Sequence, residues 1–119
     1  MYPLTAKWTI LPGNEEKAIE ALKKLAQDVQ ENEPDTLLYM VHVPNFKEKS
    51  LPTPPAGEVE FWEIYKDQLA FFKHINGTIF QDFVKNYGAL FLNDFNVPSQ
   101  VFMTTKVLTQ IAGFARKDV

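Results

Sequence analysis

Three side chains that suit acid–base chemistry lie close together in the sequence: Glu63, Tyr65 and His74. An imidazole ordinarily titrates near neutral pH, so His74 could act as a general base, with the carboxylate and the phenol orienting it or a substrate. Two other interpretations stay open at this stage. His74 could be a half-exposed helix residue packed against Phe71, and Glu63 could form a salt bridge across an interface, with Arg116 or a lysine.

Glu63 and Tyr65 belong to a predicted strand at residues 59–65, where apolar and polar side chains alternate. Because strand side chains point to opposite faces in turn, Glu63 and Tyr65 share one face with Phe61. Trp62 lies on the opposite face. Glu63 is therefore expected to stand between two aromatic rings.

His74 belongs to a predicted helix that begins at Asp67, whose carboxylate can accept a hydrogen bond from a free backbone N–H group of the first turn. The helical step of about 100° per residue predicts an apolar stripe made of Leu69, Phe72 and Ile75. His74 should lie at the edge of this stripe. The sequence thus predicts one histidine and one carboxylate at the border of an aromatic-rich wall.

Further aromatic side chains could line a pocket for a flat aromatic ligand, because small-molecule sites are mostly apolar with few polar groups. Tyr65 and Tyr87 also carry a hydroxyl that could hydrogen-bond a ligand oxygen. Aromatic residues at helix and strand spacing usually form the core, so ordinary packing is the competing interpretation. The candidate lining residues are Trp8, Tyr39, Trp62, Phe72, Phe83 and Tyr87.

The composition excludes several kinds of protein and site. A length of 119 residues suits one domain, residues 1–119. The net charge is −3 and the lysines are scattered, which argues against a nucleic-acid partner. With no cysteine and two histidines, a metal or haem site has few ligands, and no apolar run approaches the length of a membrane span. Because no export signal is visible, we expect a cytoplasmic protein with no membrane partner.

The predicted elements follow the order strand, helix, strand, strand, helix, strand. This order is typical of an α+β, ferredoxin-like βαββαβ fold, with an antiparallel sheet and the helices on one face. A Pro-rich loop at residues 44–57 acts either as a lid or as a plain hairpin insertion. The tail, residues 110–119, is expected to dock partly on a neighbour and to fray. The strands are expected at residues 4–11, 37–43, 59–65 and 101–109, and the helical segments at 14–31, from 67, and at 78–91.

One face of this sheet is expected to lack a cover from the chain itself. The helices cover a single face, yet the strands at residues 37–43 and 59–65 are apolar on both faces. A second copy of the chain is the simplest cover. We therefore expect a symmetric homodimer joined sheet to sheet.

Three segments together resemble the antibiotic biosynthesis monooxygenase (ABM) domain family, which includes quinol monooxygenase-like proteins, within the dimeric α+β barrel superfamily. The segments are KWTILPGNEEKAIEALKKLA, EPDTLLYMVHV and FWEIYKDQLAFFKHINGTIFQDF, and the resemblance covers residues 4–92. It implies a dimer of ferredoxin-like subunits, each with a pocket between its helices and its sheet. Some members oxidise phenolic polyketides or quinols with dioxygen and no cofactor, because the substrate anion itself supplies the electrons.

The resemblance implies an activity, with two rivals. The expected function is a cofactor-independent monooxygenase for a small phenolic, quinol or aromatic polyketide-type metabolite, with neither cofactor nor metal and with His74 as the acid/base group. One rival is a non-catalytic or stress-response barrel that binds an aromatic ligand. The other is an isomerase or cyclase, because YKD at residues 65–67 also resembles a branch that isomerises a phosphorylated signalling sugar.

The sequence departs from the family pattern in two places. The strand motif of the family often reads Tyr-Glu-x-Trp, whereas residues 62–65 read WEIY, with the aromatic residues exchanged. Haem-degrading members use an Asn, a Trp and a His at positions that align here with Ala6, His74 and Val84. The second difference argues against haem degradation.

Overall fold

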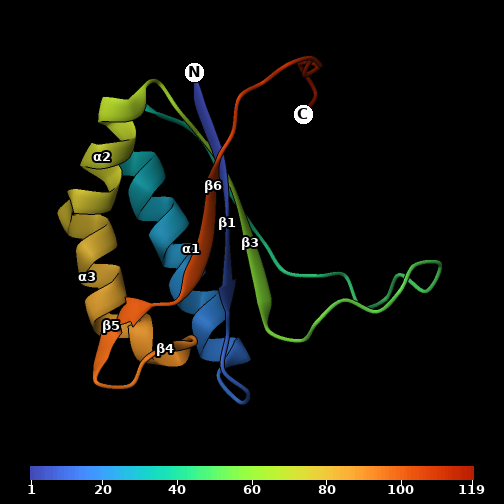
Figure 1. Ribbon diagram of the computed structural model, residues 1–119, viewed down its shortest axis with the longest axis vertical. Coiled ribbons are helices and arrows are strands. Elements are labelled where there is room, and N and C mark those ends of the chain that lie inside the picture. Colours follow the sequence, from blue (N-terminus) through green and yellow to red (C-terminus); the bar gives the residue numbers. More distant parts are fainter.

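The elements follow one another as strand, helix, strand, strand, two helices and strand, with a short hairpin before the last strand (Figure 1). The computed structural model describes residues 1–119. None of the helices is both long enough and apolar enough to cross a membrane. The elements are β1 (Tyr2–Thr9), α1 (Glu15–Asn32), β2 (Thr36–His42), β3 (Glu58–Tyr65), α2 (Gln68–Asn76), α3 (Thr78–Tyr87), the 3-10 helix η1 (Gly88–Leu90), β4 (Asn93–Asp94), β5 (Val97–Val101) and β6 (Met103–Val107).

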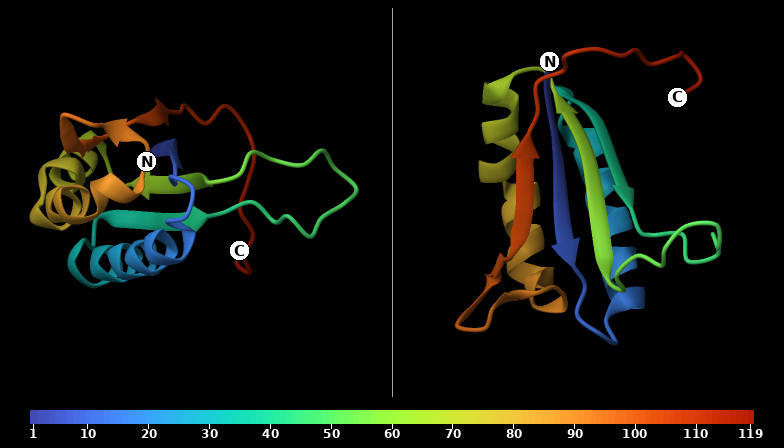
Figure 2. Two further views of the ribbon diagram at one scale, coloured as in Figure 1. Left: turned by 90° about the horizontal axis from the view of Figure 1, so that it is seen from below. Right: turned by 45° about the vertical axis from the view of Figure 1, so that its right-hand side comes forward.

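The main sheet has the strand order β2-β3-β1-β6, and all its neighbouring strands are antiparallel. The α-helices lie together on one face of it (Figure 2). This arrangement confirms the predicted α+β, ferredoxin-like architecture. Phe61, Glu63 and Tyr65 point to the covered face, and Trp62 points to the other face, as strand alternation predicts. The main core consists of Ala6, Trp8, Ile10, Ala18, Ala21, Leu22, Leu25, Val29, Val59, Phe61, Phe83, Val84, Phe91 and Val101.

Helix α2 is rotated relative to the prediction. Leu69 and Phe72, which the sequence analysis placed in an inward stripe, are 61% and 43% exposed, whereas Ala70 and His74 are buried. The helix is short and apolar on nearly every side, so its sequence alone does not determine which face turns inward. Its packing against the cluster of Leu4 and Tyr65 decides the orientation.

One of the three α-helices begins with the side-chain cap that the sequence predicts, and the other two have no side-chain cap. The Asp67 carboxylate accepts a hydrogen bond from the Ala70 N–H at 2.8 Å, as predicted. The Asn14 side chain makes no cap; its amide donates instead to the Leu90 carbonyl at 3.3 Å. Helix α3 has Gly77 as its N-cap and no side-chain cap, and the Gln81 amide donates to the carbonyl of Ile75 at 2.6 Å.

The segment between the last helix and the last strand also differs from the prediction. Helix α3 ends at Tyr87 rather than near Phe91, and part of the predicted loop forms the β4–β5 hairpin. Gly88 permits the close approach of this hairpin, since a Cβ atom there would lie 2.3 Å from the Pro98 carbonyl oxygen. The hairpin therefore packs directly on the backbone at the end of α3. The last strand begins at Met103 and ends at Val107, inside the predicted range.

The second face of the sheet has no helix over it (Figure 2). On this open face, Trp62 is 50% and Met40 38% exposed. The loop at residues 44–57 and the tail at residues 110–119 project away from the helices (Figure 1). In the tail, Ile111 and Phe114 are almost fully exposed. The open face therefore retains the apolar character that the sequence predicted.

Candidate functional site

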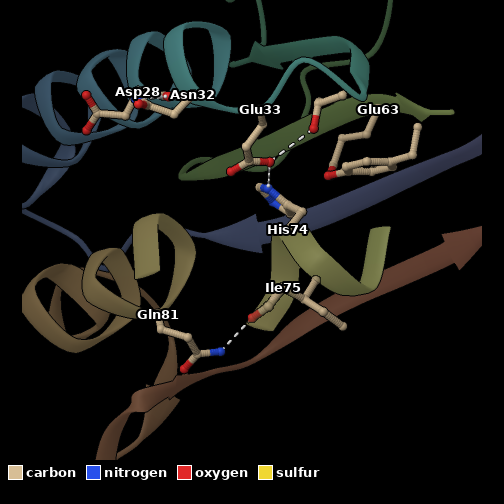
Figure 3. A network of polar contacts seen from close by, with 9 residues as sticks. Asp28, Asn32, Glu33, Glu63, His74, Ile75 and Gln81 are labelled. Atoms are coloured by element: carbon tan, nitrogen blue, oxygen red, sulfur yellow. Dashed lines mark hydrogen bonds and ion pairs between the residues drawn. The ribbon is translucent and has the colours of Figure 1, made fainter. Parts of the chain in front are cut away.

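His74 is buried at the point where α1, β2 and α2 meet. Its residue surface is 3% exposed, and its Nδ1 lies 2.7 Å from Oε1 of Glu33 (Figure 3). Glu33 is the C-cap of α1, and its backbone N–H donates to the Val29 carbonyl at 2.9 Å. The end of one helix thus supplies a carboxylate to a histidine on another.

A second buried carboxyl group lies on β3. Glu63 is 7% exposed and Tyr65 is fully buried, and the Tyr65 hydroxyl donates a hydrogen bond to Glu63 Oε1. Burial raises the pKa of Glu63, while the Tyr65 hydrogen bond and the nearby His74 oppose this increase. Burial and the Glu63 charge also raise the pKa of Tyr65. The phenol therefore stays protonated and acts as the donor of the pair.

Three aromatic rings surround the imidazole of His74. The ring centroids of Tyr39, Tyr65 and Phe80 each lie 5.4 Å from that of His74. Burial also raises the pKa of Tyr39 well above its usual value, so its hydroxyl stays neutral. These rings limit the movement of the imidazole and exclude water from its sides.

A cleft of about 590 Å³ reaches His74 from the surface. It lies between the turn from α1 to β2 and the junction of α2 with α3. Most of its lining residues carry polar side chains, with Lys73 on the α2 side and Asp35 on the turn side. The lining residues are Asn32, Glu33, Pro34, Asp35, Thr36, Ala70, Lys73, His74, Gly77, Thr78 and Ile79.

One ring nitrogen of His74 has no hydrogen-bond partner within the chain and could exchange a proton with a ligand. Nδ1 is engaged by Glu33, and Nε2 makes no hydrogen bond within the chain. A nitrogen held in this way on one side can accept or donate a proton on the other. A ligand group in the cleft would be the partner of such a transfer. No group of three or more His, Cys, Asp or Glu side chains is arranged to hold a metal ion.

The structure brings part of the predicted set together around His74. Glu63, Tyr65 and Tyr39 lie beside it, through the contacts described above. Trp8 and Phe83 are buried in the main core, with ring centroids 5.9 Å apart. Trp8 approaches the site through Phe80, whose ring lies 6.2 Å away.

Three predicted lining residues lie away from this group. Trp62 is on the open face, 4.6 Å from the His42 ring. Phe72 is on the outer side of α2, and Tyr87 is at the end of α3 against Phe83, both more than 40% exposed.

Glu33 is the site residue that the sequence analysis missed. It stands just before Pro34, in a segment that the pattern identifies only as the end of a helix. It lies 41 positions from His74 in the chain, so no local spacing links the two. No local signal in the sequence distinguishes Glu33 from its acidic neighbours Glu31 and Asp35.

Known proteins resemble this chain in sequence pattern and in fold. The family model described as antibiotic biosynthesis monooxygenase matches residues 1–86. Three solved structures have TM-scores of 0.69 to 0.74, at identities that establish the fold alone. No curated protein sequence matches the chain. The structures are an antibiotic biosynthesis monooxygenase (20% identity, 94% of this chain and 100% of that one, TM-score 0.69), a protein from Pseudomonas aeruginosa (22%, 93% and 94%, 0.71) and a candidate antibiotic biosynthesis monooxygenase from Caulobacter crescentus (16%, 93% and 90%, 0.74).

Proposed function

Because this chain belongs to the antibiotic biosynthesis monooxygenase family, we propose that it is a cofactor-independent monooxygenase for a small phenolic, quinol or aromatic polyketide-type metabolite. One observation carries the proposal: a buried histidine, held through Nδ1 by a carboxylate and packed among aromatic rings, is one of the residues that line a surface cleft. This environment suits the removal of a proton from an aromatic hydroxyl group.

In the proposed reaction, Nε2 of His74 accepts the phenolic proton of the substrate. The electron-rich anion then reduces dioxygen. In an anthrone, for example, the CH2 carbon becomes C=O, one oxygen atom enters the product and the other leaves as water. Glu63 and Tyr65 keep the inner side of the imidazole in place, and Tyr39 offers a ring against which a flat substrate can pack.

The polar and charged side chains among the cleft's lining residues support a second candidate, an isomerase for a small polar metabolite. Here His74 would move a proton between two positions of the substrate without consuming oxygen. Lys73 at the cleft wall supplies a positive charge near such a ligand.

The proposed assembly is a homodimer through the open face of the sheet. The exposed apolar side chains of that face belong to the two strands that the sequence analysis singled out, with Met40 on β2 opposite Trp62 on β3. Packing a second copy there would remove these side chains from water.

Oxygen uptake tests the monooxygenase proposal. Purified protein is incubated with a panel of quinols, anthrones and catechols, beside a control without protein for autoxidation. We expect uptake above the control, and we expect His74→Ala to lower it by roughly 100-fold or more, as loss of a general base does. Phe72→Ala, an exposed aromatic change on the same helix, serves as the matched control.

Three results would count against the proposal. Equal uptake by wild type and His74→Ala would remove His74 from the chemistry. Substrate conversion that is unchanged under anaerobic conditions would favour the isomerase, and ligand binding without conversion would favour a binding protein.

A further inference from the structure

We propose that Glu33 is a positioning residue that keeps the proton of neutral His74 on Nδ1 and thereby leaves Nε2 as the basic nitrogen. The inference rests on the proposed function for what Nε2 acts upon, but the state of the ring can be measured without any substrate. It assigns a role to the residue that caps the C-terminus of α1. In the sequence, this residue is far from the strand and helix that carry the other candidates.

The contact itself determines where the proton lies. The Glu33 and His74 side chains are 19% and 2% exposed, and Oε1 lies 2.7 Å from Nδ1. An ionised carboxylate can only accept hydrogen bonds, so Nδ1 must be the donor. In the neutral imidazole, which carries one N–H, Nε2 then keeps a free lone pair.

Glu33 is held in place through both its backbone and its side chain, and Figure 3 shows the side-chain contact with His74. Its N–H donates to the Val29 carbonyl at 2.9 Å, and its own carbonyl accepts from the Thr36 N–H at 3.0 Å. The Thr36 hydroxyl donates to the same Oε1 atom that accepts from His74, at 3.0 Å. A carboxylate fixed in this way can orient a ring rather than merely neutralise it.

The other groups around His74 do not replace Glu33. The Glu63 carboxyl group accepts from the Tyr65 hydroxyl, and burial favours its protonated form. Tyr39 and Tyr65 are neutral phenols whose rings lie beside the imidazole. Lys73 lines the cleft and carries no acceptor. Glu33 is therefore the acceptor that selects the tautomer.

Nitrogen-15 NMR of the full-length, uniformly labelled protein tests the inference. Long-range proton–nitrogen correlations distinguish a protonated from an unprotonated ring nitrogen, and His42→Gln assigns the two histidines. Above the pH at which the ring becomes neutral, we expect His74 to be the Nδ1–H tautomer, although free histidine favours the Nε2–H form. His42, whose Nδ1 lies 3.0 Å from the Glu60 carbonyl oxygen, serves as an internal reference.

Three variants separate positioning from general structural support. Glu33→Gln retains a side-chain oxygen that can accept from Nδ1–H, so His74 should keep its tautomer. Glu33→Ala removes the acceptor and should move the population of His74 towards the Nε2–H form, with His42 unchanged. Glu31→Gln, an exposed change on the same helix, should alter neither ring.

An Nε2–H tautomer in the wild-type protein would overturn the inference, and so would an unchanged tautomer in a folded Glu33→Ala variant. If Glu33→Ala does not fold, the tautomer of the wild-type protein still tests the inference, since an Nε2–H ring would overturn it. If His74 is the Nδ1–H tautomer but the protein consumes no oxygen, the monooxygenase proposal fails and the inference about Glu33 stands. If the protein consumes oxygen but His74 is the Nε2–H tautomer, the inference about Glu33 fails and the monooxygenase proposal stands.

Discussion

At the scale of single residues, the site consists of polar groups whose burial would cost free energy if they had no hydrogen-bond partners. His74 and Glu33 form one pair, and Tyr65 and Glu63 form the other. A buried carboxylate is costly, and a raised pKa is the sign of that cost. The Tyr65–Glu63 pair lies near the His74–Glu33 pair, so the protonation state of Glu63 determines the charge beside His74.

Glu63→Gln should stabilise the protein at neutral pH. Gln retains an oxygen that can accept from Tyr65 and carries no charge to bury. We expect the free energy of unfolding to rise by more than roughly 0.5 kcal/mol, the range within which most surface substitutions fall. Urea unfolding of both proteins measures the difference.

The pH dependence of this difference has a definite sign. The folded pKa of Glu63 is raised, so its contribution to stability is complete below the usual carboxyl pKa of about 4.3 and is lost as pH rises through the folded pKa. The advantage of Glu63→Gln should therefore be small at acidic pH and grow as pH increases. An advantage that shrinks with rising pH would contradict burial as the cause of the shift.

At the scale of elements, the orientation of α2 decides which side chains reach the site. Asp67 fixes the start of this helix, and Gly77 joins it to α3 with no room for a side chain, since a Cβ atom there would lie 2.7 Å from the Lys73 carbonyl oxygen. Ala70 and His74, one turn apart, then face the core together.

Asp67→Ala should weaken the first turn of α2. The variant loses the side-chain hydrogen bond to the Ala70 N–H, and such caps contribute about 1 kcal/mol. We expect a decrease of that size in the free energy of unfolding and faster amide exchange in the first turn of α2. Asp67→Asn, which keeps an acceptor oxygen, should retain most of the stability. Equal losses in both variants would mean that the charge, not the cap, matters.

At the scale of the whole molecule, the sheet separates two regions with different roles. The face that the helices cover (Figure 2) contains the core and the His74 site. The open face carries exposed apolar side chains. The loop at residues 44–57 and the tail at residues 110–119 project on the side away from the helices (Figure 1). A second copy on the open face would lie within their reach.

Trp62→Glu should dissociate the proposed homodimer. A carboxylate in the centre of an apolar interface would lose its hydration without gaining a partner. We expect sedimentation velocity at micromolar concentration to show a dimer for the wild-type protein and a monomer for the variant. Leu69→Glu, an exposed apolar position on α2, should leave the dimer intact. A wild-type monomer at this concentration would exclude the assembly.

The sequence by itself determined the order of the elements, the alternation of β3 and the apolar character of the open face. These features depend on the period of side chains along one element and on short-range turn and cap chemistry, as the Asp67 cap shows. The resemblance to the family can be recognised in the sequence for the same reason, because the motifs of the family are local. Glu63, Tyr65 and His74 could be selected as candidates from their types and spacing.

Only the tertiary structure decided that His74 faces inward and that Glu33 is its partner. An apolar pattern on nearly every side of α2 leaves its rotation undetermined until the helix packs on the sheet. The contact with Glu33 joins the ends of separate elements, and the β4–β5 hairpin depends on the close approach of Pro98 to Gly88. Periodicity reports the faces of one element, whereas these features depend on how elements meet in space.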